Sequence, residues 1–170
     1  MEKRGNIIRK VGLDTNVFVD MILKEPNFYI NNAKIIKRGG LFVNYFVIQE
    51  AWGILVHFRR IDRKSAGVLI DRFVEKNDVK VIKKKDFLEE QVNSYFDLLK
   101  KQEKLHKNIE ISGNKDNDLL IISIYKTAGV DCIFTRNTFD FQRACKYLGL
   151  KIERQLTNTQ FMLRRLKKRS

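Results

Sequence analysis

Several residue types are scarce in this chain. Its 170 residues include one proline, one tryptophan, two cysteines and two histidines. The single proline, Pro26, leaves no proline-rich linker, and no internal repeat or low-complexity segment occurs. Cys132 and Cys145 lie thirteen positions apart, without the spacing of a zinc site or a disulfide framework. We therefore expect two buried thiols.

Long hydrophobic runs are also lacking. No stretch approaches the roughly 18 uninterrupted apolar residues of a membrane span, and charged residues occur throughout the first 20 positions. We expect a soluble, cytoplasmic protein that does not enter a membrane. The 44% hydrophobic content is that of a folded domain. A chain of this length buries roughly 70% of its unfolded surface, which suffices for one core.

Acidic residues are outnumbered by basic ones. The chain has 20 Asp and Glu against 34 Lys and Arg, a formal net charge of +14. Residues 151–170 alone hold seven basic residues and one acidic residue. Clustered cations gain free energy when a polyanion releases its condensed counterions. The excess therefore predicts RNA, DNA or an anionic membrane surface as a partner, without naming a reaction.

Short β-branched runs alternate with longer helical patterns, which indicates an α/β fold. We expect strands at 7–13, 41–44, 79–82, 131–135 and 150–153. We expect helices at 27–38, 46–59, 63–76, 117–127 and 139–148, and one more around Val92 and Leu99. Strands joined by helices run parallel, with right-handed crossovers. The expected fold class is a three-layer α/β/α sandwich around a mainly parallel sheet of about five strands.

The charge distribution divides the chain into an expected domain at 1–153 and a basic helix or tail at 154–170. In the tail, four apolar residues interleave with basic ones, namely Phe161, Met162, Leu163 and Leu166. This pattern is similar to that of an interfacial membrane helix. We favour the alternative that the tail packs on the domain or contacts RNA.

Acidic residues fall at the carboxyl ends of the predicted strands, where open parallel sheets bind their ligands. Asp14 ends the first strand, and a helix or turn cap is its structural alternative. Glu50 stands three positions after Val47 and four before Ile54, so it shares an apolar helix face with them. A carboxylate there must be paired, protonated or bound to a cation. An ion pair with a neighbouring helix is therefore the alternative for Glu50.

Two further segments place acids at the same edge. Asp118 shares one face of a helix with apolar residues, and we expect Asp116 to cap that helix, which leaves Asp118 without an ordinary structural role. Asp140 follows the fourth strand and has interaction with the helix dipole as its alternative. Thr135 and Asn137 lie between that strand and Asp140. Either residue could cap the helix that follows.

Four carboxylates thus surround one edge of a parallel sheet in a strongly basic protein. They are Asp14, Glu50, Asp118 and Asp140. Their mutual repulsion calls for cations, and Mg²⁺ binds carboxylates together with substrate phosphate. The cluster therefore predicts metal-assisted phosphodiester hydrolysis.

These motifs resemble those of the PIN-domain nucleases, particularly the small VapC-type toxin ribonucleases of prokaryotic toxin–antitoxin pairs. The resemblance runs from about Val11 to Glu153 and rests on four segments in order. They are LDTNVF at 13–18, Glu50, DLLIIS at 118–123 and TRNTFDF at 135–141. Many family members have Asp at the position of Asn137, so Asp140 is the expected fourth acid here.

The resemblance implies an endoribonuclease that depends on Mg²⁺ or Mn²⁺. It implies that Asp14, Glu50 and Asp118 hold the first ion, and that Asp140 supports the site and a second ion. It implies substrate-binding roles for four further residues, namely Asn16, Thr135, Arg136 and Asn137. For Arg136, a solvated surface position is the alternative.

The resemblance also implies partners. An antitoxin segment would lie in the active-site groove, and two chains would form a two-fold homodimer. A function of another class is the alternative, namely an RNA-processing or RNA-binding module. Its acidic site would be structural or vestigial, without nuclease activity.

Overall fold

A five-stranded parallel sheet forms the centre of the computed structural model, which describes residues 9–86, 89–105 and 115–167. The strands are β1 (Val11–Leu13), β2 (Leu41–Asn44), β3 (Lys80–Ile82), β4 (Cys132–Thr135) and β5 (Lys151–Arg154). Their order is β3-β2-β1-β4-β5, and each neighbouring pair is parallel. The chain therefore builds the sheet outward from β1 in both directions. The carboxyl ends of β1 and β4 border the switch point at which such sheets bind ligands.

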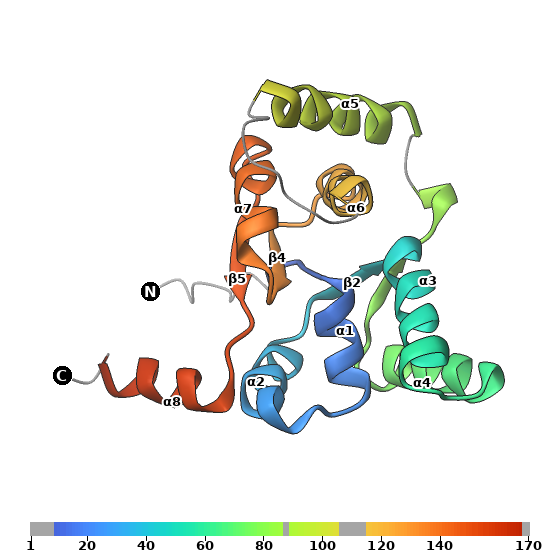
Figure 1. Ribbon diagram of the computed structural model, residues 1–170, viewed down its shortest axis with the longest axis vertical. Helices are drawn as coiled ribbons and strands as arrows, with labels where there is room; N and C mark the ends of the chain where they lie inside the picture. The colour runs from blue at the N-terminus through green and yellow to red at the C-terminus, as the bar shows by residue number, and fades with distance from the viewer. Residues whose placement is uncertain (1–8, 87–88, 106–114, 168–170) are drawn as a thin grey trace, which may run out of the picture.

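Helices cover both faces of this sheet (Figure 1). In that view α5, α6 and α7 lie above the strands, and α1, α2 and α4 lie below them. The α-helices are α1 (Thr15–Ile22), α2 (Tyr29–Arg38), α3 (Tyr45–Gly53), α4 (Arg63–Lys76), α5 (Glu89–Leu105), α6 (Lys115–Thr127), α7 (Thr138–Tyr147) and α8 (Asn158–Lys167). Short 3-10 turns occupy Pro26–Phe28 and Lys84–Asp86, and a π-helical turn at Ile54–Phe58 continues α3.

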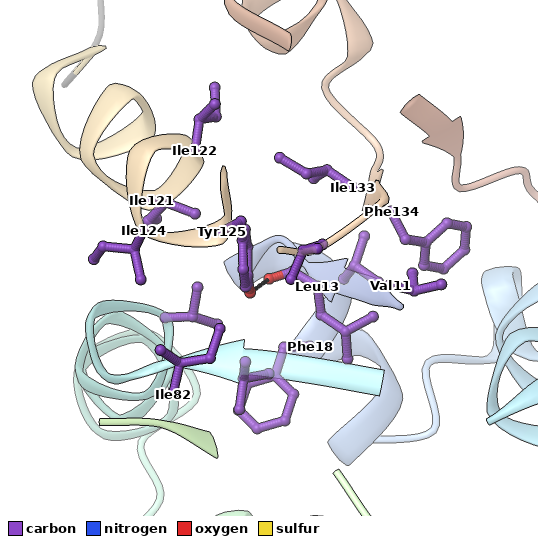
Figure 2. Close-up of a cluster of buried hydrophobic side chains, with 14 of the residues drawn as sticks. Val11, Leu13, Phe18, Ile82, Ile121, Ile122, Ile124, Tyr125, Ile133 and Phe134 are labelled. Atoms are coloured by element: carbon purple, nitrogen blue, oxygen red, sulfur yellow. Dashed lines mark hydrogen bonds between the residues drawn. The ribbon is translucent and has the colours of Figure 1, made fainter. Parts of the chain in front are cut away.

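Strands β1 and β4 are buried along their whole length, as expected for a parallel sheet covered on both faces. Figure 2 shows apolar side chains of β1, β4 and α6 packed together, with Phe18 of α1 on the other side of the strands. Burial of such surface contributes about 25 cal/mol per Å². The packing holds the ends of β1 and β4 side by side, and the backbone N–H of Asp14 donates to the carbonyl of Phe134 at 3.1 Å.

The predicted three-layer architecture and its five parallel strands are confirmed. Helix α4 has its predicted bounds, and α2 ends before Gly39, whose φ of 73° favours glycine. Within the described residues, the first strand begins only at Val11. The helix predicted from residue 27 is divided, because Pro26 opens a 3-10 turn and α2 begins at Tyr29.

Helix α1 has no counterpart among the predicted helices. Seven of its eight residues are buried, including the polar Thr15 and Asp20, so its polar residues do not mark a solvent-exposed face. The β-branched residues Val17 and Val19 also favour strand over helix in an isolated sequence. Packing between the sheet and its neighbouring helices decides this element.

The C-terminal helix α8 is attached to α2. The backbone N–H of Ile30 donates to Asn158 Oδ1 at 3.0 Å, and Asn158 Nδ2 donates to the carbonyl of Pro26 at 2.7 Å. Phe161 is buried, and Lys34 Nζ lies 5.4 Å from the centroid of its ring. The start of the basic segment is therefore docked on the body of the protein.

None of the helices within 9–86, 89–105 and 115–167 combines the length and apolar character that a membrane span requires. The division into a domain at 1–153 and a tail at 154–170 stays a prediction.

Candidate active site

Asp14 lies at the carboxyl end of β1, where the chain turns from strand into helix α1. Its side chain is buried, and it caps α1 because Oδ1 accepts the backbone N–H of Thr15 at 2.7 Å. The other oxygen, Oδ2, accepts the hydroxyl of Thr135 at 2.8 Å. The cap that was the structural alternative for Asp14 is thus present. It coexists with a second contact to the end of β4.

The environment of Asp14 disfavours its ionised form. Burial raises the pKa of this carboxyl to about 6, from an ordinary value of 3.8. Hydrogen bonds from Thr135 and Thr15 lower the pKa, the charge of Glu50 raises it, and the charge of Arg136 lowers it. The donors around Asp14 therefore compensate only part of the cost of burying its charge.

Glu50 faces Asp14 from helix α3. This helix begins directly after β2, where Asn44 Oδ1 caps it by accepting the backbone N–H of Val47 at 3.1 Å. The Thr15 hydroxyl donates to Glu50 Oε2 at 2.6 Å, so Thr15 contacts both carboxylates, one through its backbone and one through its side chain. Because the donor is neutral, this bond orients Glu50 without neutralising its charge.

Helix α6 supplies the third side of the site. Asn117 Nδ2 donates to Glu50 Oε1 at 2.9 Å, and the half-buried Asp118 is the next residue. Asp116 is exposed and forms an ion pair with Lys100 of α5 at 2.9 Å. The predicted N-cap role of Asp116 is wrong, because α6 already begins at Lys115. Both aspartates flank Asn117, but Asp116 is exposed and paired with Lys100, whereas Asp118 is half-buried.

The end of β4 closes the site. Thr135 is fully buried, donates to Asp14, and accepts the backbone N–H of Asn137 at 3.0 Å. The side chains of Asn16, in the first turn of α1, and of Asn137 are exposed. Asp140 lies in the first turn of α7, and its side chain falls outside the described part of the structure.

Arg136 is held by two residues that the sequence did not single out. Its guanidinium lies 3.4 Å from Asp20 Oδ2 and 4.8 Å from the ring centroid of Phe28. Asp20 is buried on α1, and burial raises its pKa while the charge of Arg136 lowers it. One sequence signal existed for Asp20, since it is the sole charged residue within the apolar stretch 17–22.

The site therefore brings together three of the predicted residues, Asp14, Glu50 and Thr135. Thr15 donates to both carboxylates, and Thr135 donates to Asp14. Their oxygens are the hard ligands that Mg²⁺ and Mn²⁺ prefer. The raised pKa of the buried Asp14 indicates a negative charge that a cation would stabilise. Among the described side chains, however, no three Asp, Glu, His or Cys residues are grouped as a preformed metal site. The chemistry of the donors fits a divalent cation.

The sequence was compared with protein families and with curated proteins. Residues 11–147 match the PIN-domain family model. A comparison with curated protein sequences gives no significant match.

Several solved structures share the fold. VapBC2 from Rickettsia felis, bound to a DNA fragment from its promoter, has a TM-score of 0.63 at 23% identity, covering 85% of this chain and 97% of that one. VapBC-1 from nontypeable Haemophilus influenzae has a TM-score of 0.61 at 18% identity, covering 85% and 97%. VapC20 from Mycobacterium tuberculosis, a toxin that cleaves the sarcin–ricin loop, has a TM-score of 0.52 at 14% identity, covering 73% and 87%. At these identities the likeness to the solved structures concerns the fold alone. Because the PIN-domain family model spans most of the chain, the protein belongs to the PIN-domain family.

Proposed function

We propose that this protein is a divalent-metal-dependent endoribonuclease. The observation that carries the proposal is the buried Asp14, linked through Thr15 to Glu50 at the carboxyl edge of a parallel sheet. Two carboxylates held together with neutral donors form a site for a cation. Membership of the PIN-domain family supports nuclease chemistry for such a site.

The residues proposed to hold Mg²⁺ or Mn²⁺ are Asp14, Glu50 and Asp118, with Asp140 in support. When bound, such an ion activates water for attack on phosphorus and stabilises the charge that develops on the phosphate. The chain's own contribution is orientation. Thr135 and the backbone of Thr15 fix the two oxygens of Asp14, and the Thr15 and Asn117 side chains fix those of Glu50.

RNA is the proposed substrate because the acidic site belongs to a protein of net charge +14. A phosphate backbone is attracted to the basic surface and meets the carboxylates only with a cation between them. Asn16, Arg136 and Asn137 expose polar side chains beside the carboxylates and are proposed to bind the strand. Thr135 is proposed to act there by holding Asp14 in place.

A toxin of a toxin–antitoxin pair is the proposed biological role. The support is the similarity in fold to VapBC complexes and to VapC20, a toxin that cleaves the sarcin–ricin loop. An antitoxin that neutralises the chain, a two-fold homodimer and a cytoplasmic location belong to the same proposal. Co-expression with the product of an adjacent small gene tests the pairing, since an antitoxin must co-purify with the chain and suppress its activity.

Cleavage of a labelled single-stranded RNA, in Mn²⁺, Mg²⁺ or EDTA, tests the proposed reaction. Asp14→Asn should abolish cleavage and leave the circular dichroism spectrum unchanged. Asp131→Asn is the matched control and should cleave normally, because Asp131 directly precedes β4 at the end of the strand away from the site. Equal cleavage by the Asp14 variant, or cleavage in EDTA, would overturn the proposal.

The second candidate is an RNA-binding module in which the acids have only structural roles. It is favoured by one observation, since each oxygen of Asp14 and of Glu50 already accepts a hydrogen bond within the protein. Isothermal calorimetry separates the two functions. A nuclease site must give Mn²⁺-dependent heat that Asp14→Asn reduces, and a purely structural site gives none.

A further inference from the structure

Two exposed side chains follow the carboxyl end of β4 without belonging to the acidic cluster. The Arg136 side chain is 43% exposed, and Phe139, in the first turn of α7, is 70% exposed. Strand β4 pairs with β1 so that Phe134 lies opposite Leu13. Residues 136–139 therefore emerge beside Asp14, at the same edge of the sheet.

Arg136 is held in place although it is partly exposed. Asp20 lies 3.4 Å from one guanidinium nitrogen, and the ring of Phe28 stacks under the guanidinium at 4.8 Å. Asp20 Oδ2 accepts no hydrogen bond from the residues that the structure describes. The charge of Arg136, beside this oxygen, is the largest influence that lowers the pKa of the buried acid, ahead of a hydrogen bond from Gln155 and the charge of Arg59. A guanidinium has five N–H donors in a rigid fork. Contact with Asp20 on one side leaves the exposed side suited to a phosphate.

Phe139 presents an aromatic ring to solvent three residues after this held cation. A single exposed apolar side chain is ordinary on a protein surface and by itself indicates nothing. Its position is what matters, because it is three residues from Arg136 and one from Asp140 at the binding edge. Unpaired bases stack on aromatic rings while cations bind the neighbouring phosphates.

We propose that Arg136 and Phe139 form a nucleotide subsite of the active site, in which Arg136 binds a backbone phosphate and Phe139 stacks the base of one single-stranded RNA nucleotide. Asp20 and Phe28 are positioning residues that orient Arg136. The identity of the ligand as RNA rests on the proposed function. The subsite requires an unpaired base, because a base within a duplex cannot reach an exposed ring.

Binding of a fluorescein-labelled single-stranded RNA decamer, followed by anisotropy in EDTA, tests the subsite without cleavage. Arg136→Gln should weaken binding about tenfold and lower the salt slope by about 0.7, the value for one phosphate on a single strand. Lys151→Gln, at the start of β5 on the opposite edge, is the charge-matched control and should change the affinity less than about twofold.

Phe139→Leu should weaken binding of the single strand about five- to tenfold, and leave binding of a duplex of the same sequence unchanged. Phe58→Leu is the matched control, because Phe58 is 80% exposed on the π-helical turn after α3. The stacking role is wrong if the two phenylalanine variants behave alike, or if duplex binding falls equally.

Asp20→Asn and Asp131→Asn separate positioning from net charge, since each removes one negative charge. A charge effect alone would strengthen RNA binding in both variants. Positioning instead predicts that Asp20→Asn weakens binding about fivefold, and that this loss disappears when Arg136 is already glutamine. Additive losses in the double variant would overturn the positioning role.

Phe28→Leu provides a second route to the same test, since it removes the ring under Arg136 and leaves every charge in place. It should weaken RNA binding as Asp20→Asn does, with a circular dichroism spectrum like that of the wild type. The two proposals fail separately. Decamer binding that depends on Arg136 and Phe139 without any cleavage contradicts the nuclease alone, and cleavage with unchanged KM in both variants contradicts the subsite alone.

Discussion

The ring of Tyr125 lies directly against the backbone of Gly12, where a Cβ atom would stand 2.8 Å from the ring. The Tyr125 hydroxyl donates to the carbonyl of Leu13 at 2.6 Å (Figure 2) and approaches that of Phe42 at 3.3 Å. Tyr125 therefore ties α6 to β1 and β2 just below Asp14. Since α6 also carries Asn117, this contact sets the distance between the two sides of the candidate site.

Gly12→Ala should destabilise the protein, because the fully buried Tyr125 ring cannot move away while its hydroxyl is bonded to the strands. Overpacking of this kind costs about 1–3 kcal/mol. Urea denaturation measures the loss. The control is Gly67→Ala inside α4, where a Cβ meets nothing within 4 Å and a gain of about 0.5–1 kcal/mol is expected. In a Tyr125→Leu background, the cost of Gly12→Ala should largely vanish, and an undiminished cost contradicts the contact.

The stability of the metal-free protein should depend on pH through Asp14. Its pKa is about 6 in the folded chain and near the ordinary 3.8 in the unfolded chain, so the folded state binds more protons between these values. The contribution of Asp14 to stability is then greatest below pH 4 and falls as pH rises to about 6, by up to about 3 kcal/mol. Asp14→Asn removes this dependence and should be the more stable protein at pH 7.5.

Chemical denaturation in EDTA at pH 4, 5, 6 and 7.5 measures this difference. The comparison between wild type and variant cancels the other groups that titrate in the same range. Parallel curves for the two proteins would show that the burial of Asp14 does not disfavour its charge.

Thr135→Val should shift the acidic limb of the cleavage profile to higher pH. The Thr135 hydroxyl donates to Asp14 Oδ2 and lowers the pKa of that carboxyl, so its loss raises the pKa further. At low pH, each unit by which the pKa of Asp14 rises lowers the ionised fraction of this carboxyl about tenfold. Rates measured from pH 5 to 9 should therefore fall more at pH 6 than at pH 8. Thr135→Ser keeps the hydroxyl and should restore the profile, whereas a uniform loss at every pH would rule out this role.

The exposed cations of α8 should contribute to RNA attraction and not to cleavage. Replacing Arg164, Arg165 and Lys167 with glutamine should lower the salt slope of binding by at most about 2, or about 0.7 for each phosphate released. The turnover number should not change. Neutralisation is preferable to deletion because Asn158 and Phe161 attach α8 to α2. A large decrease in the turnover number of a folded variant would show that α8 takes part in the reaction.

Much of the architecture was predictable because it depends on short-range patterns. Short apolar runs, glycines past helix ends and the alternation of strands with helices indicate a parallel sheet. The helical spacing of apolar residues from Ala66 to Val74 indicates α4. Helix α1 was not predictable in this way, since almost all of it is buried and its polar residues do not mark a solvent-exposed face. The N-cap of α6 was misplaced because a run of polar residues offers several equivalent starts.

The candidate site divides in the same manner. The sequence by itself determined the acids and their order, since Asp14 and Glu50 are unusual residue types at the end of a strand and on an apolar helix face. Only the tertiary structure decided their partners. Thr15 joins the two carboxylates, Asn117 orients Glu50, and Asp20 holds Arg136. Local periodicity determines which residues are buried, but hydrogen bonds between residues 35 to 121 positions apart exist only once the sheet brings distant segments to one edge.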